Sequence, residues 1–125
     1  MVDESTPKII SSRRSSERID ARILVQLRSG EEFVQAYSQN ISRGGIYLET
    51  STLPDPNATI EVSFDLSSIF GSSGPQNLTL TGRVVRLMTV NESGQTIHKI
   101  AIQFMDLDPT LQLQINALYD QLAQA

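Results

Sequence analysis

Apolar and polar residues alternate along most of the chain between residues 19 and 105. Ile19, Ala21, Ile23, Val25 and Leu27 are separated by single residues that are mostly polar. Since successive side chains of a strand point to opposite faces, this pattern predicts a half-buried strand. The same reasoning predicts further strands over residues 33–38, 45–50, 60–66, 78–90 and 95–105.

Turn residues separate these runs. Ser29-Gly30-Glu31 and Asn91-Glu92-Ser93-Gly94 are typical of tight turns, and Phe70–Asn77 is expected to be a surface loop. The segment Leu53–Asn57 holds two prolines, which cannot donate to a sheet ladder. Gly82 interrupts the longest run and predicts a bulge or a bend there. About six short antiparallel strands with tight turns indicate a small closed barrel or a sandwich.

The pattern changes near the end of the chain. Asp108 is a good N-cap, and Pro109 suits the first position of a helix. Apolar residues then recur at helical spacing, which predicts an amphipathic helix over residues 109–124. They are Leu111, Ile115, Leu118 and Leu122, with Tyr119 beside them. This stripe packs on the sheet or closes one end of a barrel, or else it serves a homodimer.

Length and composition favour a single soluble domain. The chain has 125 residues, 39% hydrophobic residues and no cysteine, which excludes disulfides and thiolate metal sites. No apolar run approaches the roughly 20 residues that cross a bilayer, so no membrane insertion is expected. The N-terminal residues do not resemble a signal peptide, and we expect a cytoplasmic protein.

The distribution of charge is uneven. Residues 1–30 hold six basic and four acidic residues, whereas the remainder holds four basic and ten acidic ones, for a net charge of −4. An acidic chain is a poor general binder of DNA or RNA. The local positive charge before the first strand instead suggests a small anionic partner.

Residues 1–12 are polar and are expected to form a flexible N-terminal segment ahead of one domain over residues 13–125. Within that domain we expect an arginine arm at 13–18 and a barrel at 19–106. The stretch Ser12–Arg18 contains no apolar residue. It cannot gain order by burial, so any structure that it adopts must come from a partner.

Catalytic and metal sites find little support. His98 is the only histidine, so neither a Ser-His-Asp triad nor a histidine metal cluster is easily assembled. Gly71-Ser72-Ser73-Gly74 lacks the Lys-Ser/Thr ending of a P-loop. The acidic residues are scattered. We therefore expect no catalytic residue, no metal and no cofactor.

The stretch Asn40-Ile41-Ser42-Arg43-Gly44-Gly45 lies between two predicted strands. Asn, Ser and Gly are ordinary turn residues, so a plain hairpin turn explains it. The same residues also suit a polar ligand, because they offer an amide, a hydroxyl and closely approachable backbone.

Two motifs together resemble the PilZ domain family, whose signature is RxxxR followed by [D/N]xSxxG. Arg14-Ser15-Ser16-Glu17-Arg18 matches the first part, with Arg13 as an additional arginine, and Asn40–Gly45 matches the second. One predicted strand pair separates them, as in the family. The resemblance covers roughly residues 12–106. It implies a mainly β fold, a small six-stranded antiparallel β-barrel with a C-terminal α-helix.

The resemblance also implies a ligand, the bacterial second messenger cyclic di-GMP. By the family pattern, Arg14 and Arg18 contact guanine edges and phosphates, with Arg13 in support. Asn40 and Ser42 hydrogen-bond a guanine, and Gly45 keeps the turn tight. Many members have Asp at the position of Asn40. Since an amide oxygen is a weaker acceptor than a carboxylate, binding is expected to persist with lower affinity.

The expected function is therefore a cyclic di-GMP receptor or adaptor. The arginine arm would fold over the nucleotide against the Asn40–Gly45 turn and signal to an effector protein. The alternative is a PilZ-like protein-interaction module that does not bind nucleotide. The remaining four arginines could add contacts to the ligand, but no motif assigns them a role and we expect solvated surface charges: Arg22, Arg43, Arg83 and Arg86.

Overall fold

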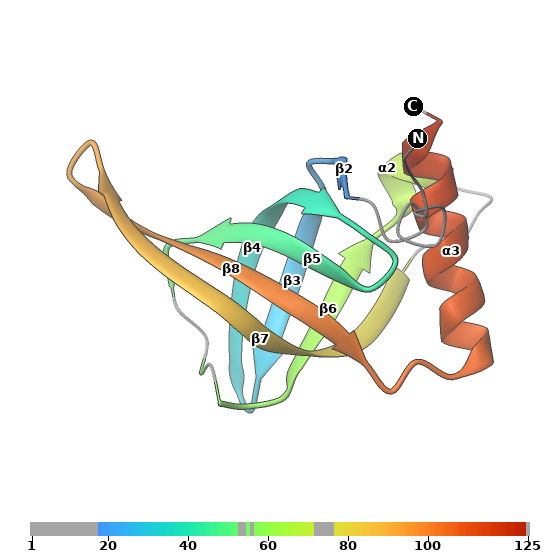
Figure 1. Cartoon of the computed structure of the whole chain (residues 1–125), viewed down its shortest axis with the longest axis horizontal. Helices are drawn as coiled ribbons and strands as arrows, with labels where there is room; N and C mark the ends of the chain where they lie inside the picture. Colours follow the sequence, from blue (N-terminus) through green and yellow to red (C-terminus); the bar gives the residue numbers. More distant parts are fainter. Residues whose placement is uncertain (1–17, 53–54, 56, 72–76, 125) are drawn as a thin grey trace, which may run out of the picture.

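Six antiparallel strands close into a barrel in the computed structural model, and a helix packs at one end of it (Figure 1). The structure describes residues 18–52, 55, 57–71 and 77–124. The strands are β2 (Ile19–Asp20), β3 (Leu24–Ser29), β4 (Glu32–Ile41), β5 (Gly45–Thr50), β6 (Ile60–Asp65), β7 (Asn77–Glu92) and β8 (Gln95–Met105). The helices are α2 (Ser67–Phe70) and α3 (Pro109–Ala123).

Two pairings between strands that are not consecutive, β3 with β6 and β5 with β8, bring the strands into one ring. Around the ring the order is β4-β3-β6-β7-β8-β5, and β5 pairs with β4 to complete it. Every pairing is antiparallel. The two-residue β2 lies beside the end of β4. The predicted six-stranded barrel with a C-terminal helix is thus confirmed.

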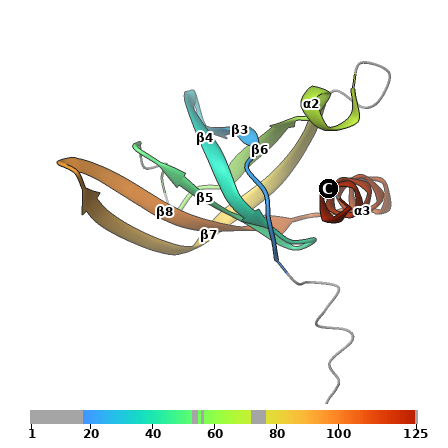
Figure 2. The same cartoon turned by 90° about the horizontal axis from the view of Figure 1, so that it is seen from above.

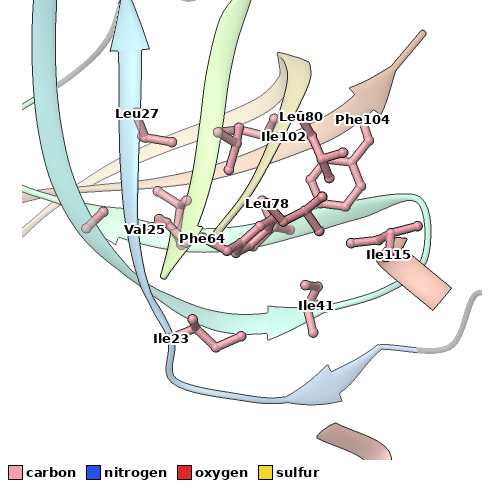
Figure 3. Close-up of a cluster of buried hydrophobic side chains, with 14 of the residues drawn as sticks. Ile23, Val25, Leu27, Ile41, Phe64, Leu78, Leu80, Ile102, Phe104 and Ile115 are labelled. Carbon is pink, nitrogen blue, oxygen red and sulfur yellow. The ribbon is translucent and has the colours of Figure 1, made fainter. Parts of the chain in front are cut away.

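The inward-facing side chains of the barrel form one core, shown in Figure 3. Phe64 is fully buried and meets Phe104 edge to face at 6.2 Å between ring centroids. Ile115 and Leu118 of α3 belong to the same core and are fully buried. The helical stripe therefore packs against the core at one end of the barrel, and the homodimer stays a prediction.

The first predicted strand is interrupted, which the alternating pattern did not indicate. β2 ends at Asp20 and β3 begins at Leu24, with both paired to β4. The buried hydroxyl of Ser38 fills the gap: it accepts from the Ile23 N–H at 2.9 Å and donates to the Ala21 carbonyl. This side chain replaces two ladder contacts, so the strand can break without leaving buried backbone groups unpaired.

Gly82 also plays a different part from the one predicted. Here β7 is regularly paired, with Gly82 opposite Phe104, and the register shift lies instead between Val84 and Arg86. A Cβ atom at Gly82 would lie 2.5 Å from Cγ2 of Ile102. This glycine permits close packing of β7 on β8, and the bulge is three residues further along.

The closing helix follows its sequence signals. Asp108 accepts a hydrogen bond from the Leu111 N–H at 2.8 Å, and Pro109 occupies the first turn. The sequence pattern did not reveal the short helix α2, which includes Phe70, the first residue of the expected loop. Asn77 belongs to β7, and residues 72–76 of that loop lie outside the described residues.

The long β7–β8 hairpin projects beyond the barrel on the side opposite α3, as Figures 1 and 2 both show. In the described ranges, neither helix has the length and apolar character required to traverse a bilayer. Likewise, the described side chains form no cluster of three or more His, Cys, Asp or Glu residues suited to a metal ion.

Candidate functional site

The two halves of the predicted motif meet on the outer surface of the barrel. A terminal nitrogen of Arg18 donates to the side-chain oxygen of Asn40 at 2.9 Å, across 22 residues of sequence. A guanidinium has only donors, so the amide oxygen of Asn40 must be the atom that faces it. Arg13 and Arg14, the other arginines of the predicted arm, lie outside the described residues.

A β-bulge in β4 directs Asn40 outward. Ala36 and Ser38 point into the barrel, and simple alternation would place Asn40 there too. The register between β4 and β5 shifts between Ser38 and Asn40, which makes Gln39 an extra residue. After this shift Ile41 is the fully buried side chain and Asn40 faces out. Asn40 and Ile41 are therefore strand residues, whereas the sequence predicted that they belong to the turn.

Several hydrogen bonds hold the turn. The Ser42 N–H donates to the Gly45 carbonyl at 2.9 Å, and the Ser42 hydroxyl accepts from the Gly44 N–H at 3.3 Å. The Gly44 carbonyl accepts from the Phe104 N–H at 2.9 Å, which ties the turn to β8. Ser42 is only 5% exposed. Its hydroxyl thus organises the turn, and the predicted contact with a guanine stays a prediction.

Gly45 has a steric reason to be glycine. A Cβ atom there would lie 2.5 Å from the carbonyl oxygen of Ile102 on the neighbouring strand β8. Backbone cannot rotate out of the way as a side chain can. The expectation that this residue keeps the turn tight stays a prediction, and the observed reason for glycine is the close approach of β5 to β8.

A hollow of about 290 Å³ opens beside the Arg18–Asn40 contact. Its lining combines both residues with four side chains from β5, β7 and β8, which sequence reasoning did not select: Tyr47, Val85, Arg86 and Ala101. The sequence indicates only that these side chains are on the outward-facing positions of their strands. To predict that they line one hollow, one must also know which strands are neighbours in the barrel.

Two of the remaining arginines have partners outside this hollow. Arg22, in the gap between β2 and β3, stacks on the Tyr37 ring at 4.0 Å from its centroid. Arg43, inside the turn, donates to the Asp120 carboxylate of α3 at 2.6 Å and lies 4.2 Å from the centroid of the Tyr119 ring. The turn is therefore attached to α3 as well as to β8.

Away from the site, the carboxylate of Asp65 accepts hydrogen bonds from the hydroxyl and the N–H of Ser67 at 2.7 and 3.1 Å. These bonds favour the charged form and hold the pKa of Asp65 below its ordinary value of 3.8.

Comparison with protein families agrees with this geometry. The fold is a small antiparallel barrel whose outer face carries Arg18 and the segment Asn40–Gly45. The family model of the PilZ domain matches residues 12–121. The chain belongs to the PilZ domain family. Among curated proteins no match was found.

Several solved structures share the fold. The Bacillus subtilis inhibitor of motility MotI/DgrA is 21% identical with a TM-score of 0.65, over 89% of this chain and 52% of that one. The chain thus spans about half the length of MotI/DgrA. The PilZ domain of CeSA from a cellulose-synthesizing bacterium gives 18% identity and a TM-score of 0.64, over 86% and 99% of the two chains.

The third structure is the PilZ domain of YcgR from Escherichia coli, solved with c-di-GMP. It is 13% identical with a TM-score of 0.65, over 90% of this chain and 93% of that one. The family thus includes domains that bind this nucleotide.

Proposed function

We propose that the chain is a cyclic di-GMP receptor that binds the nucleotide on the outer face of the barrel, between Arg18 and the Asn40–Gly45 turn. One observation carries this proposal: the guanidinium of Arg18 lies 2.9 Å from the side-chain oxygen of Asn40. The two motifs are thereby joined in space, which neither motif requires by itself. The YcgR domain solved with c-di-GMP supports the same ligand.

The chemistry of these residues suits the nucleotide. Cyclic di-GMP carries two phosphates and two guanines, and an arginine fork can hold a phosphate or the O6 and N7 atoms of guanine. The guanine N1–H and N2–H groups need an acceptor, which the oxygen of Asn40 provides. That oxygen accepts from Arg18 at 2.9 Å. In the proposed complex the partners are exchanged: the guanine takes the acceptor, and Arg18 turns to the ligand.

This exchange provides a route to signalling. Residues 12–18 contain no apolar side chain that could fix them by burial. Contacts with a dianion would order the arginines of this arm over the barrel, and the ordered arm would form a new surface for an effector protein. The receptor acts through binding and not through catalysis.

Isothermal titration with cyclic di-GMP tests the proposal. We expect saturable heat with the wild type and at least about ten-fold weaker binding by Arg18→Ala and Arg14→Ala, because hydrogen bonds to charged groups contribute about 1.5–3 kcal/mol. Ser42→Ala should also weaken binding, by loosening the turn. Arg28→Ala is the matched control, since Arg28 is exposed on β3, contacts Gly30, Glu61 and the Phe33 ring, and does not line the hollow.

Two results would count against the proposal. Absence of heat with the wild type at high micromolar nucleotide would leave the alternative of an interaction module that does not bind nucleotide. Equal weakening by Arg18→Ala and Arg28→Ala would mean that only overall charge matters. The variant Asn40→Asp examines the acceptor itself, and we expect tighter binding because charge-assisted hydrogen bonds are roughly twice as strong as neutral ones.

A further inference from the structure

We propose that Arg86 and Tyr47 are ligand-binding residues outside the family motif, and that the hollow over Ala101 seats one guanine of the nucleotide. This inference rests on the proposed function and extends it across the barrel surface, from β4 to β7. It assigns a role to an arginine that no motif selects.

The residues concerned form one continuous row. Asn40 of β4 is the cross-strand partner of Tyr47 of β5, and Tyr47 is the partner of Ala101 of β8. Ala101 in turn pairs with Arg86 of β7. Direct cross-strand partners lie about 4.5–5.5 Å apart, so their side chains can act on one ligand. The row begins at the Arg18–Asn40 contact and ends at a second arginine.

A second bulge places Arg86 in this row. The register of β7 on β8 shifts between Val84 and Arg86, so Val85 is the extra residue. Val84 packs against the core, whereas Val85 is 51% exposed and lines the hollow together with Arg86. Bulges re-aim side chains in this way and are common beside functional sites.

The small side chain of Ala101 makes the hollow. Ala101 is 6% exposed and lies between the larger Tyr47 and Arg86, so a methyl group forms the floor while longer side chains form the walls. The volume of about 290 Å³ is at the lower limit of the roughly 300–1,000 Å³ found for small-molecule sites. Such a space suits one base with its phosphate and not a whole cyclic dinucleotide.

The charge of the hollow selects an anion. Among the side chains that the structure describes, two arginines and no carboxylate line it, on a chain whose net charge is −4. Within the described ranges Arg86 forms neither a salt bridge nor a side-chain hydrogen bond, so its guanidinium is available to a ligand. The Tyr47 ring adds a flat surface on which a base can stack.

Arg83 offers a matched control for Arg86. Both are exposed arginines of β7, but Arg83 is paired with Gln103 and does not line the hollow. In titrations with cyclic di-GMP we expect Arg86→Ala to weaken binding at least about ten-fold and Arg83→Ala by no more than about two-fold. Both variants remove one exposed charge, so a difference between them reports contact and not overall electrostatics.

Tyr47 is tested by a second pair of variants. Tyr47→Ala should weaken binding by roughly ten-fold, because the stacking of one base on the ring is lost. Tyr47→Phe keeps the ring and should bind like the wild type. Thermal melts of all four variants check that the fold is kept.

The outcomes separate the two proposals. If the wild type binds and the motif variants fail, but Arg86→Ala equals Arg83→Ala or Tyr47→Ala equals the wild type, the inference is overturned and the receptor function stands. If the wild type does not bind cyclic di-GMP at all, both are overturned.

Discussion

Replacing Gly45 by alanine should push β5 away from β8 at the end of the ladder that carries the candidate site. The added Cβ would lie 2.5 Å from the carbonyl oxygen of Ile102 and 3.5 Å from Cα of Gln103. Real Cβ contacts essentially never fall below 3.0 Å, so the strands must separate by about 0.5 Å or more. Both contacting atoms are backbone, and six residue pairs hold β5 to β8.

The expected cost follows from this clash. Overpacking a tight site costs about 1–3 kcal/mol, and alanine returns about 0.4–1 kcal/mol by restricting the unfolded chain. At the middle of both ranges the net loss in the free energy of unfolding is about 1.3 kcal/mol. For a chain of 125 residues this corresponds to a fall of roughly 3–10 °C in Tm.

Urea unfolding followed by far-ultraviolet circular dichroism measures this loss, and Gly44→Ala is its control. Gly44 is the preceding residue, and a Cβ atom there would meet nothing within 4 Å. We expect Gly44→Ala to lower the free energy of unfolding by less than about 0.5 kcal/mol. Equal midpoints for the two variants would refute the argument that close approach of β5 to β8 requires glycine at position 45.

Three further predictions concern side chains that hold the barrel together. Ser38→Ala removes the buried hydroxyl that serves Ile23 and Ala21, and we expect urea unfolding to show a loss of about 1–3 kcal/mol. Arg43→Ala breaks an ion pair whose side chains are 28% and 58% exposed and removes the contact with the Tyr119 ring, and the same assay should show a loss of about 1–2 kcal/mol. Asp65→Asn should be slightly less stable than the wild type at pH 7. Because the pKa of Asp65 is lowered in the folded protein, the charged carboxylate contributes to stability above pH 3.8, and this contribution disappears as the pH falls through the lowered pKa. Thermal melts of both proteins over a series of acidic pH values measure this difference.

The strands and the closing helix could be predicted because their signals are local. Alternation over residues 95–105 and the Asp108-Pro109 start of the helix need only neighbouring residues, and both are present in the structure. The interruption after Asp20 could not be predicted, because it depends on the hydroxyl of Ser38, which lies on another strand. When a side chain of one strand replaces the backbone hydrogen-bond partners of another strand, the alternation of apolar and polar residues in that second strand does not change.

Only part of the candidate site could be predicted from the sequence. The spacing of the motifs selected Arg18 and Asn40, and the structure joins them. The remaining wall of the hollow was not predicted, because Tyr47, Ala101 and Arg86 become neighbours through strand register. Register is a property of pairs of strands, and one strand's pattern of polarity does not determine it.

The two bulges explain how a closed barrel acquires a polar site on its wall. In a regular strand Asn40 would share the inward face of Ala36 and Ser38, which would bury an amide and expose the side chain of Ile41. Each half of that exchange is unfavourable by about 1–3 kcal/mol. The extra residue Gln39 removes both penalties, because it returns Ile41 to the core and leaves Asn40 outside. At the far wall the extra residue Val85 leaves Arg86 facing outward, but its neighbours Val85 and Leu87 are 51% and 44% exposed, so no side chain is returned to the core there. The core therefore stabilises the arrangement that presents Asn40, so substitutions that disturb the bulge in β4 should reduce stability and nucleotide binding together.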